Sequence, residues 1–157
     1  MQSTEKPKFV DLVPPTSALI KVVERHPSDP SLLNLLGLLS EQQGLFNQAS
    51  QAFSRALVIL EKSPSLLKES AAARANLGRV LCAQGHFQDA ITCLSELSSP
   101  DVDSKLGLGI ALFFDRQLEK SMKEFEQALT LITDTSDLRT QAVLLICQVR
   151  GSHCWCL

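Results

Sequence analysis

Small, apolar and polar residues recur in the same order in two stretches of the chain, SEQQGLFNQASQAFSRAL (40–57) and CAQGHFQDAITCLSEL (82–97). In each stretch a Gln-Gly pair is followed two positions later by a phenylalanine and three positions after that by an alanine. A pattern that returns at a fixed order predicts a repeat architecture, in which each unit buries its apolar face against its neighbours.

Glycines earlier in each unit extend the pattern to a third copy. Gly37, Gly78 and Gly109 lie 41 and 31 residues apart, and each directly follows a leucine. The residues twelve, sixteen and nineteen positions after each glycine are again small or apolar. In chain order they are Ala49, Phe53 and Ala56; Ala90, Leu94 and Leu97; and Ser121, Phe125 and Ala128.

The pattern resembles the tetratricopeptide repeat, a helix–turn–helix unit of 34 residues with a Leu-Gly pair in its first helix and an A-x₃-F motif in its second. The resemblance covers roughly residues 12–150 and implies an all-α solenoid, a superhelix of about three full repeats flanked by half-repeats. The predicted units are a second helix at 12–28, repeats at 30–64, 65–100 and 101–134, a first helix at 136–150, and an irregular tail at 151–157. Because half-repeats leave apolar faces uncovered, we expect the 157-residue array to be a piece of a longer protein.

Capping residues support these helix boundaries. Asp29 before Pro30, and Ser63 before Pro64, predict helix starts. The 41-residue step adds seven residues to the 34-residue period, so the second repeat is expected to begin early, near Ser65. The 31-residue step removes three residues near LSSPD (97–101), which predicts a shortened second helix and an irregular array.

The glycines have two predicted roles. In the family, the glycine of the first helix faces the small residue of the second helix, so the two backbones approach closely. Gly44 and Gly85 are expected to end first helices in the left-handed conformation. The third unit has Arg116 at that position, which predicts either a different turn or modest strain.

Composition excludes several classes of protein. A net charge of −2 offers no basic surface for nucleic acid or an anionic membrane, and the apolar run LLNLLGLL (32–39) is too short to span a bilayer. The N-terminus lacks the pattern of a secretory signal. Five cysteines without C-x-x-C spacing predict a reduced, intracellular chain. We expect it in the cytoplasm, with the nucleus as a further location.

Candidate catalytic and metal-binding residues are sparse. His26, His86 and His153 fall in predicted turns or the tail, without a neighbouring carboxylate or nucleophile in a catalytic spacing. Cys82 and Cys93 are expected to be buried apolar groups. The tail GSHCWCL crowds three soft ligands but cannot close a tetrahedral site alone. We therefore expect no enzyme activity, no cofactor and no metal.

The resemblance also implies where a partner would bind. Family geometry places one side of each first helix on a concave surface, which predicts a protein-binding face of Asn34, Leu38, Asn76, Arg79, Leu106, Ile110 and Phe113. Phe113 and Phe114 could serve packing instead. The carboxylate clamp of chaperone-binding members is not expected, because Asn76 alone matches its five residues and Asp103 would repel the ligand.

The favoured function is therefore a scaffold that binds other proteins, and the rival is a structural spacer within a longer solenoid. The irregular repeats are similar to those of the scaffold subunit of the superkiller complex, which assists cytoplasmic RNA decay by the exosome. That resemblance implies that the array holds a helicase and a WD-repeat subunit.

Overall fold

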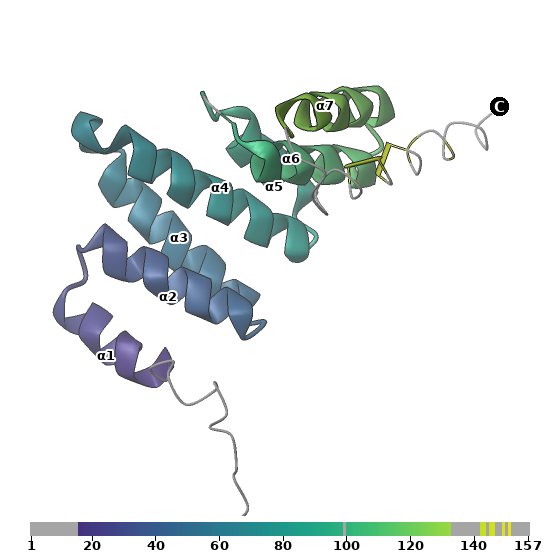
Figure 1. Ribbon diagram of the computed structural model, residues 1–157. Coiled ribbons are helices and arrows are strands. Elements are labelled where there is room, and N and C mark those ends of the chain that lie inside the picture. Colours follow the sequence, from purple (N-terminus) through teal and green to yellow (C-terminus); the bar gives the residue numbers. More distant parts are fainter. Residues whose placement is uncertain are drawn as a thin grey trace, which may run out of the picture.

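The computed structural model describes residues 16–98, 100–132, 142–143, 145–146, 149 and 151, and within these ranges it contains α-helices and a 3₁₀ turn but no strand. The prediction of an all-α solenoid is confirmed (Figure 1). In chain order the elements are α1 (Thr16–Arg25), α2 (Pro30–Gln42), α3 (Phe46–Leu60), η2 (Pro64–Leu66), α4 (Leu67–Ala83), α5 (Phe87–Ser95), α6 (Val102–Phe114) and α7 (Leu118–Leu131).

Consecutive helices pair into hairpins, and the hairpins stack. Helix α2 packs on α3, α4 on α5 and α6 on α7, while α3 contacts α4 and α5 contacts α6. The first helices of the hairpins also touch one another, α2 against α4 and α4 against α6. The described parts of the second helices, α3, α5 and α7, make few or no contacts with one another. The first helices α2, α4 and α6 are therefore closer together and lie on the inner side of the curve.

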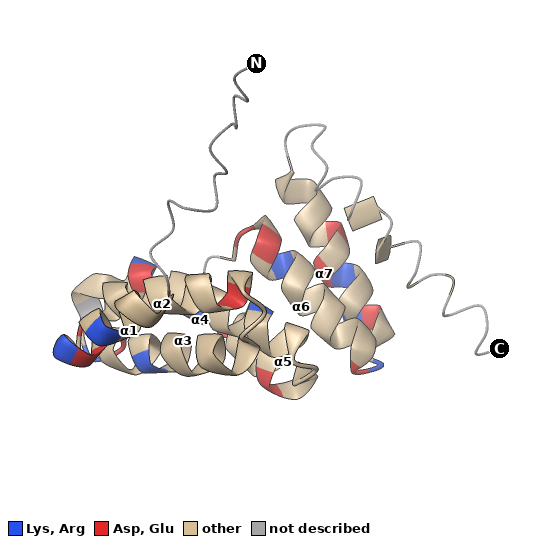
Figure 2. Ribbon diagram, turned by 90° about the horizontal axis from the view of Figure 1, so that it is seen from below, with Lys and Arg blue, Asp and Glu red and all other residues tan. Residues whose placement is uncertain are grey.

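The array is irregular in the places that the sequence predicts. Helix α5 has 9 residues, whereas α3 has 15 and α7 has 14, which confirms the shortened second helix. The second repeat starts with the 3₁₀ turn Pro64–Leu66, where Ser63 has extended backbone angles but makes no capping hydrogen bond. The last hairpin also runs in a different direction from α1–α4 (Figure 2).

Aspartates cap two of the first helices. Asp29 Oδ1 accepts hydrogen bonds from the backbone N–H groups of Ser31 (2.9 Å) and Leu32 (3.3 Å), and Pro30 occupies the first turn. At α6, Asp101 Oδ1 accepts from the Ser104 N–H at 2.9 Å. Each carboxylate satisfies backbone donors that have no partner within the helix.

The three helical glycines interlock with the side chain sixteen residues further along the chain. A Cβ atom built on Gly37 would lie 2.5 Å from Phe53 Cε1, one on Gly78 would lie 2.5 Å from Leu94 Cγ, and one on Gly109 would lie 2.3 Å from the Phe125 ring. The side chains sixteen residues on therefore fill the space left by each glycine, beside the small residue that was expected to face it. Ala49, Ala90 and Ser121 are buried beside these contacts, and the Ser121 hydroxyl donates a 2.8 Å hydrogen bond to the Gly109 carbonyl.

The core continues from hairpin to hairpin. Leu19 and Val23 of α1 pack with α2 and α3, which is consistent with a lone second helix at the start of the array. At the other end, Ala142, Ile146 and Val149 are buried against Phe125 and other residues of α7. The described residues of the predicted helix at 136–150 are helical; its other residues and the tail beyond Gly151 lie outside the described part.

The turns inside the hairpins share one backbone conformation. Gly44 and Gly85 have φ angles of 72° and 80°, as predicted, and Arg116 has a φ of 66° at the corresponding place in the third hairpin. Of the two alternatives for Arg116, the structure shows the strained one: the turn is the same, but its left-handed residue carries a side chain.

Arg116→Gly is expected to raise the free energy of unfolding by about 1 kcal/mol, because glycine removes the clash between Cβ and the backbone in this conformation. Urea titration followed by circular dichroism measures the change. Arg116→Ala is the matched control, since it removes the same guanidinium but keeps the Cβ. Equal stability of the two variants would show that the turn is not strained.

Candidate functional site

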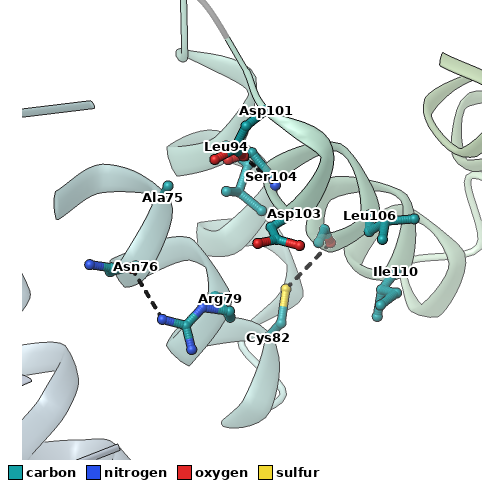
Figure 3. A pocket seen from close by; sticks show the side chains of 11 residues that line it. Ala75, Asn76, Arg79, Cys82, Leu94, Asp101, Asp103, Ser104, Leu106 and Ile110 are labelled. Carbon is teal, nitrogen blue, oxygen red and sulfur yellow. Dashed lines mark hydrogen bonds between the residues drawn. The ribbon is translucent and has the colours of Figure 1, made fainter. Parts of the chain in front are cut away.

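A groove with a volume of about 600 Å³ lies on the inner side of the array, between α4 and α6 (Figure 3). Its walls come from the two first helices, from Leu94 of α5 and from the segment that joins the second repeat to the third. The lining residues are Ala75, Asn76, Arg79, Cys82, Leu94, Asp101, Asp103, Ser104, Leu106, Gly107 and Ile110.

Helical spacing explains which side chains share the groove. Ala75, Arg79 and Cys82 are at positions i, i+4 and i+7 of α4, so they project from one face. Asp103, Gly107 and Ile110 have the same spacing on α6. The two faces meet across the groove because α4 packs against α6.

Three of the predicted binding residues belong to one polar network. Asn76 Nδ2 donates to Asn34 Oδ1 at 3.2 Å, and Arg79 Nη2 donates to Asn76 Oδ1 at 3.1 Å. The Arg79 guanidinium also forms an ion pair with Glu41 of α2. The network joins α2 to α4, and it orients amide groups that can bind the main chain of an extended polypeptide.

The remaining predicted residues divide between the groove and the core. Ile110 is half-buried; it lines the groove and also packs against the core cluster that contains Leu106 and Phe125. Leu106 also borders the groove, but it is only 4% exposed and packs in the core with α7, so its assignment to an accessible binding face was wrong. Leu38 and Phe113 are half-buried and pack against core clusters. Phe114, in contrast, is 56% exposed and stacks on Phe87 with ring centroids 4.9 Å apart.

The groove contains a thiol, but its environment disfavours the reactive form. Burial raises the pKa of Cys82 to about 11, so the side chain is a neutral thiol at physiological pH. Its Sγ donates a weak hydrogen bond to the Gly107 carbonyl at 3.7 Å. Burial also raises the pKa of Cys93. Both cysteines are half-buried, less than the sequence predicted.

Other chemistry is sparse in the described part of the chain. His26 and His86 are exposed in turns. Within the described ranges, no three His, Cys, Asp or Glu side chains gather as metal ligands. None of the helices described there combines the length and apolarity needed to cross a bilayer.

Comparison with known proteins identifies the class. Residues 49–112 match the tetratricopeptide repeat family. Among solved structures, residues 41 to the end of MamA from Desulfovibrio magneticus RS-1 superpose with a TM-score of 0.66 at 19% identity, covering 87% of this chain and 82% of that one. YrrB, titled a TPR protein with an unusual peptide-binding site, has a TM-score of 0.68 at 16% identity, covering 88% and 67%. The chain belongs to the tetratricopeptide-repeat proteins.

Two curated relatives are more similar in sequence. Tetratricopeptide repeat protein 37 of Xenopus laevis is 36% identical over 115 residues, which is 73% of this chain and 7% of that protein. Human superkiller complex protein 3 is 29% identical over 119 residues, which is 76% of this chain and 8% of that protein. The chain therefore spans less than a tenth of the length of these relatives.

Seven residues of the groove were absent from the predicted protein-binding face: Ala75, Cys82, Leu94, Asp101, Asp103, Ser104 and Gly107. Gly107 could have been found from its helical spacing with Asp103 and Ile110. Leu94 lies on α5, so the packing of α5 against α6 brings it to the groove, whereas Asp101 is the N-cap of α6 and is placed there by that helix.

Proposed function

We propose that the chain is a segment of a non-catalytic scaffold that binds an extended segment of another protein in the groove between α4 and α6. The groove itself is the observation that carries the proposal. Its volume of about 600 Å³ is that of a ligand-binding cleft, it is lined by apolar atoms and a few polar groups, and it lies on the inner side of the solenoid.

We further propose that the parent protein is a subunit of a superkiller complex and acts in cytoplasmic RNA decay, with the nucleus as a second location. The identities of 36% and 29% to tetratricopeptide repeat protein 37 and superkiller complex protein 3 support this assignment. The partners would then be the helicase and WD-repeat subunits, which the scaffold holds without contacting nucleic acid directly. In the described helices, Lys and Arg are scattered among Asp and Glu rather than gathered on one face (Figure 2).

A structural spacer is the second candidate. The observation in its favour is that Leu106, which was predicted to contact a partner, is buried in the core, and that Leu38 and Phe113 are half-buried against core clusters. A spacer would only transmit length and curvature, so substitutions in the groove would leave partner capture unchanged.

Ile110→Asp separates these two functions. A carboxylate on the groove wall should repel the apolar part of a bound segment, so we expect at least a tenfold loss of the co-purified helicase and WD-repeat proteins from cells that express the tagged chain. Val58→Asp is the matched control, because Val58 is 56% exposed on α3, which does not line the groove. Retained capture by a folded Ile110→Asp chain would favour the spacer.

A further inference from the structure

The carboxylate of Asp103 projects into the groove between α4 and α6 (Figure 3). Asp103 is exposed, and it makes no hydrogen bond or ion pair within the described part of the chain. Asp101, at the same end of the groove, uses one oxygen to accept from the Ser104 N–H. The end of the groove at the start of α6 therefore presents one unpaired and one partly engaged carboxylate.

Nearby cations do not neutralise these carboxylates. The guanidinium of Arg79, the lining cation, points toward Asn76 and is paired with Glu41. Two further cations on α4 and α6 are held by carboxylates outside the lining: Arg74 by Glu61 and Glu96, and Lys105 by Glu124. The N-terminal dipole of α6 offsets about half a charge. The groove thus keeps a net negative charge at the start of α6.

The floor next to Asp103 is neutral and largely apolar. Ile110 and the protonated thiol of Cys82 lie along it, and Ala75 and Leu94 complete it. Lysine and arginine have apolar stems that pack on such surfaces while the charged end reaches a polar partner. An acidic side chain would meet repulsion in the same place.

We propose that the groove selects an extended segment of a partner protein that carries a lysine or arginine beside an apolar residue, with the basic group paired to Asp103. This inference rests on the proposed function, since it assigns the chemistry of the segment that the groove binds. It distinguishes the chain from carboxylate-clamp members of the family, which hold an acidic C-terminus.

A peptide array tests the proposal with the purified 157-residue chain. Three sets of twelve-residue peptides would have the same randomised flanking residues. The sets would differ only in the central pair, which is Leu-Lys, Leu-Gln or Leu-Glu. We expect the lysine set to bind about fivefold more tightly than the glutamine set, as for a partly exposed ion pair, and the glutamate set to bind least. Asp103→Asn should remove the preference, and Asp103→Lys should reverse it.

Glu119→Lys is the matched control, because Glu119 is also an exposed acidic residue in the first turn of a helix, on α7 outside the groove. It should leave the preference unchanged. Ile110→Asp separates this proposal from the proposed function. In one outcome, Ile110→Asp removes peptide binding but Asp103→Lys leaves the charge preference unchanged. That outcome would overturn the basic-segment proposal and leave the groove as a binding site.

Binding of all sets that survives Ile110→Asp would contradict the proposed function as well. Failure of the lysine set to bind at millimolar peptide would overturn the proposal, as would a preference for the glutamate set. Sedimentation tests another occupant: self-association of the chain that Ile110→Asp abolishes would assign the groove to a second copy and overturn the proposal.

Discussion

Replacing Phe53 with alanine is expected to lower the free energy of unfolding by about 3–5 kcal/mol. The ring is fully buried, and it fills the space where Gly37 has no side chain. Its removal loses the transfer free energy of a phenyl group and leaves a cavity between α2 and α3, which cannot close because both helices are fixed by other contacts. Since small domains are stable by only about 5–15 kcal/mol, this is a large fraction of the total.

Chemical denaturation followed by circular dichroism at 222 nm measures this change. The expected loss corresponds to a melting temperature lower by roughly 6–20 °C for a chain of this size. Phe114→Ala is the matched control, because Phe114 is 56% exposed and contacts other aromatic rings at the surface. It should change the free energy of unfolding by less than about 1 kcal/mol. Similar losses for the two variants would contradict the interlocked packing described for α2 and α3.

Two glycines on α6 are expected to respond in opposite directions to the same change. Gly109→Ala should lower the free energy of unfolding by about 2 kcal/mol, because the new Cβ would lie 2.3 Å from the Phe125 ring, which is fully buried and cannot move away. Displacing the helices would also lengthen the hydrogen bond from Ser121 to the Gly109 carbonyl.

Gly107→Ala is the internal control, two residues earlier on the same helix. A Cβ there would meet Leu94 Cδ1 at 3.4 Å, which is an ordinary contact. The higher helix propensity of alanine should therefore raise the free energy of unfolding by about 0.5–1 kcal/mol. Urea midpoints of both variants, measured side by side, test the pair. A Gly109→Ala chain as stable as Gly107→Ala would show that the close approach of α6 to α7 is misplaced.

Local sequence signals were sufficient to predict the frame of the fold. Asp29 and Pro30 marked the start of α2, Gly44 and Gly85 marked the turns, and the missing residues near LSSPD marked the short α5. These features depend on backbone conformation and on contacts within one hairpin, so the spacing of residue types along the chain encodes them directly.

Contacts between hairpins were harder to predict. Counting within one repeat placed Leu106 on the open face. In the structure α6 contacts α4 on one side and α7 on another, and Leu106 packs with the core residues of α7. The ion pair of Arg79 with Glu41 joins residues 38 positions apart in adjacent repeats. Such pairs depend on how each hairpin is rotated on the previous one, which the repeat pattern does not specify.

The role of Asp103 in the groove was not predicted from the sequence. In the sequence analysis, Asp103 was used only to exclude the carboxylate clamp, because its carboxylate would repel an acidic ligand. In the structure the same carboxylate faces a groove whose cation, Arg79, is paired with Glu41. The property that excluded one ligand therefore favours the opposite one, and only the arrangement of the surrounding charges reveals this.

Site-specific photo-crosslinking from position 110 tests most directly whether the groove binds another protein. A photoreactive phenylalanine analogue would replace Ile110 in the groove, or Val58 on the solvent face of α3, and the chain would be irradiated in the cells that produce it. The account predicts that position 110 crosslinks to an extended segment of a different protein and that position 58 does not. Equal crosslinking from both positions, or crosslinks from position 58 alone, would contradict it.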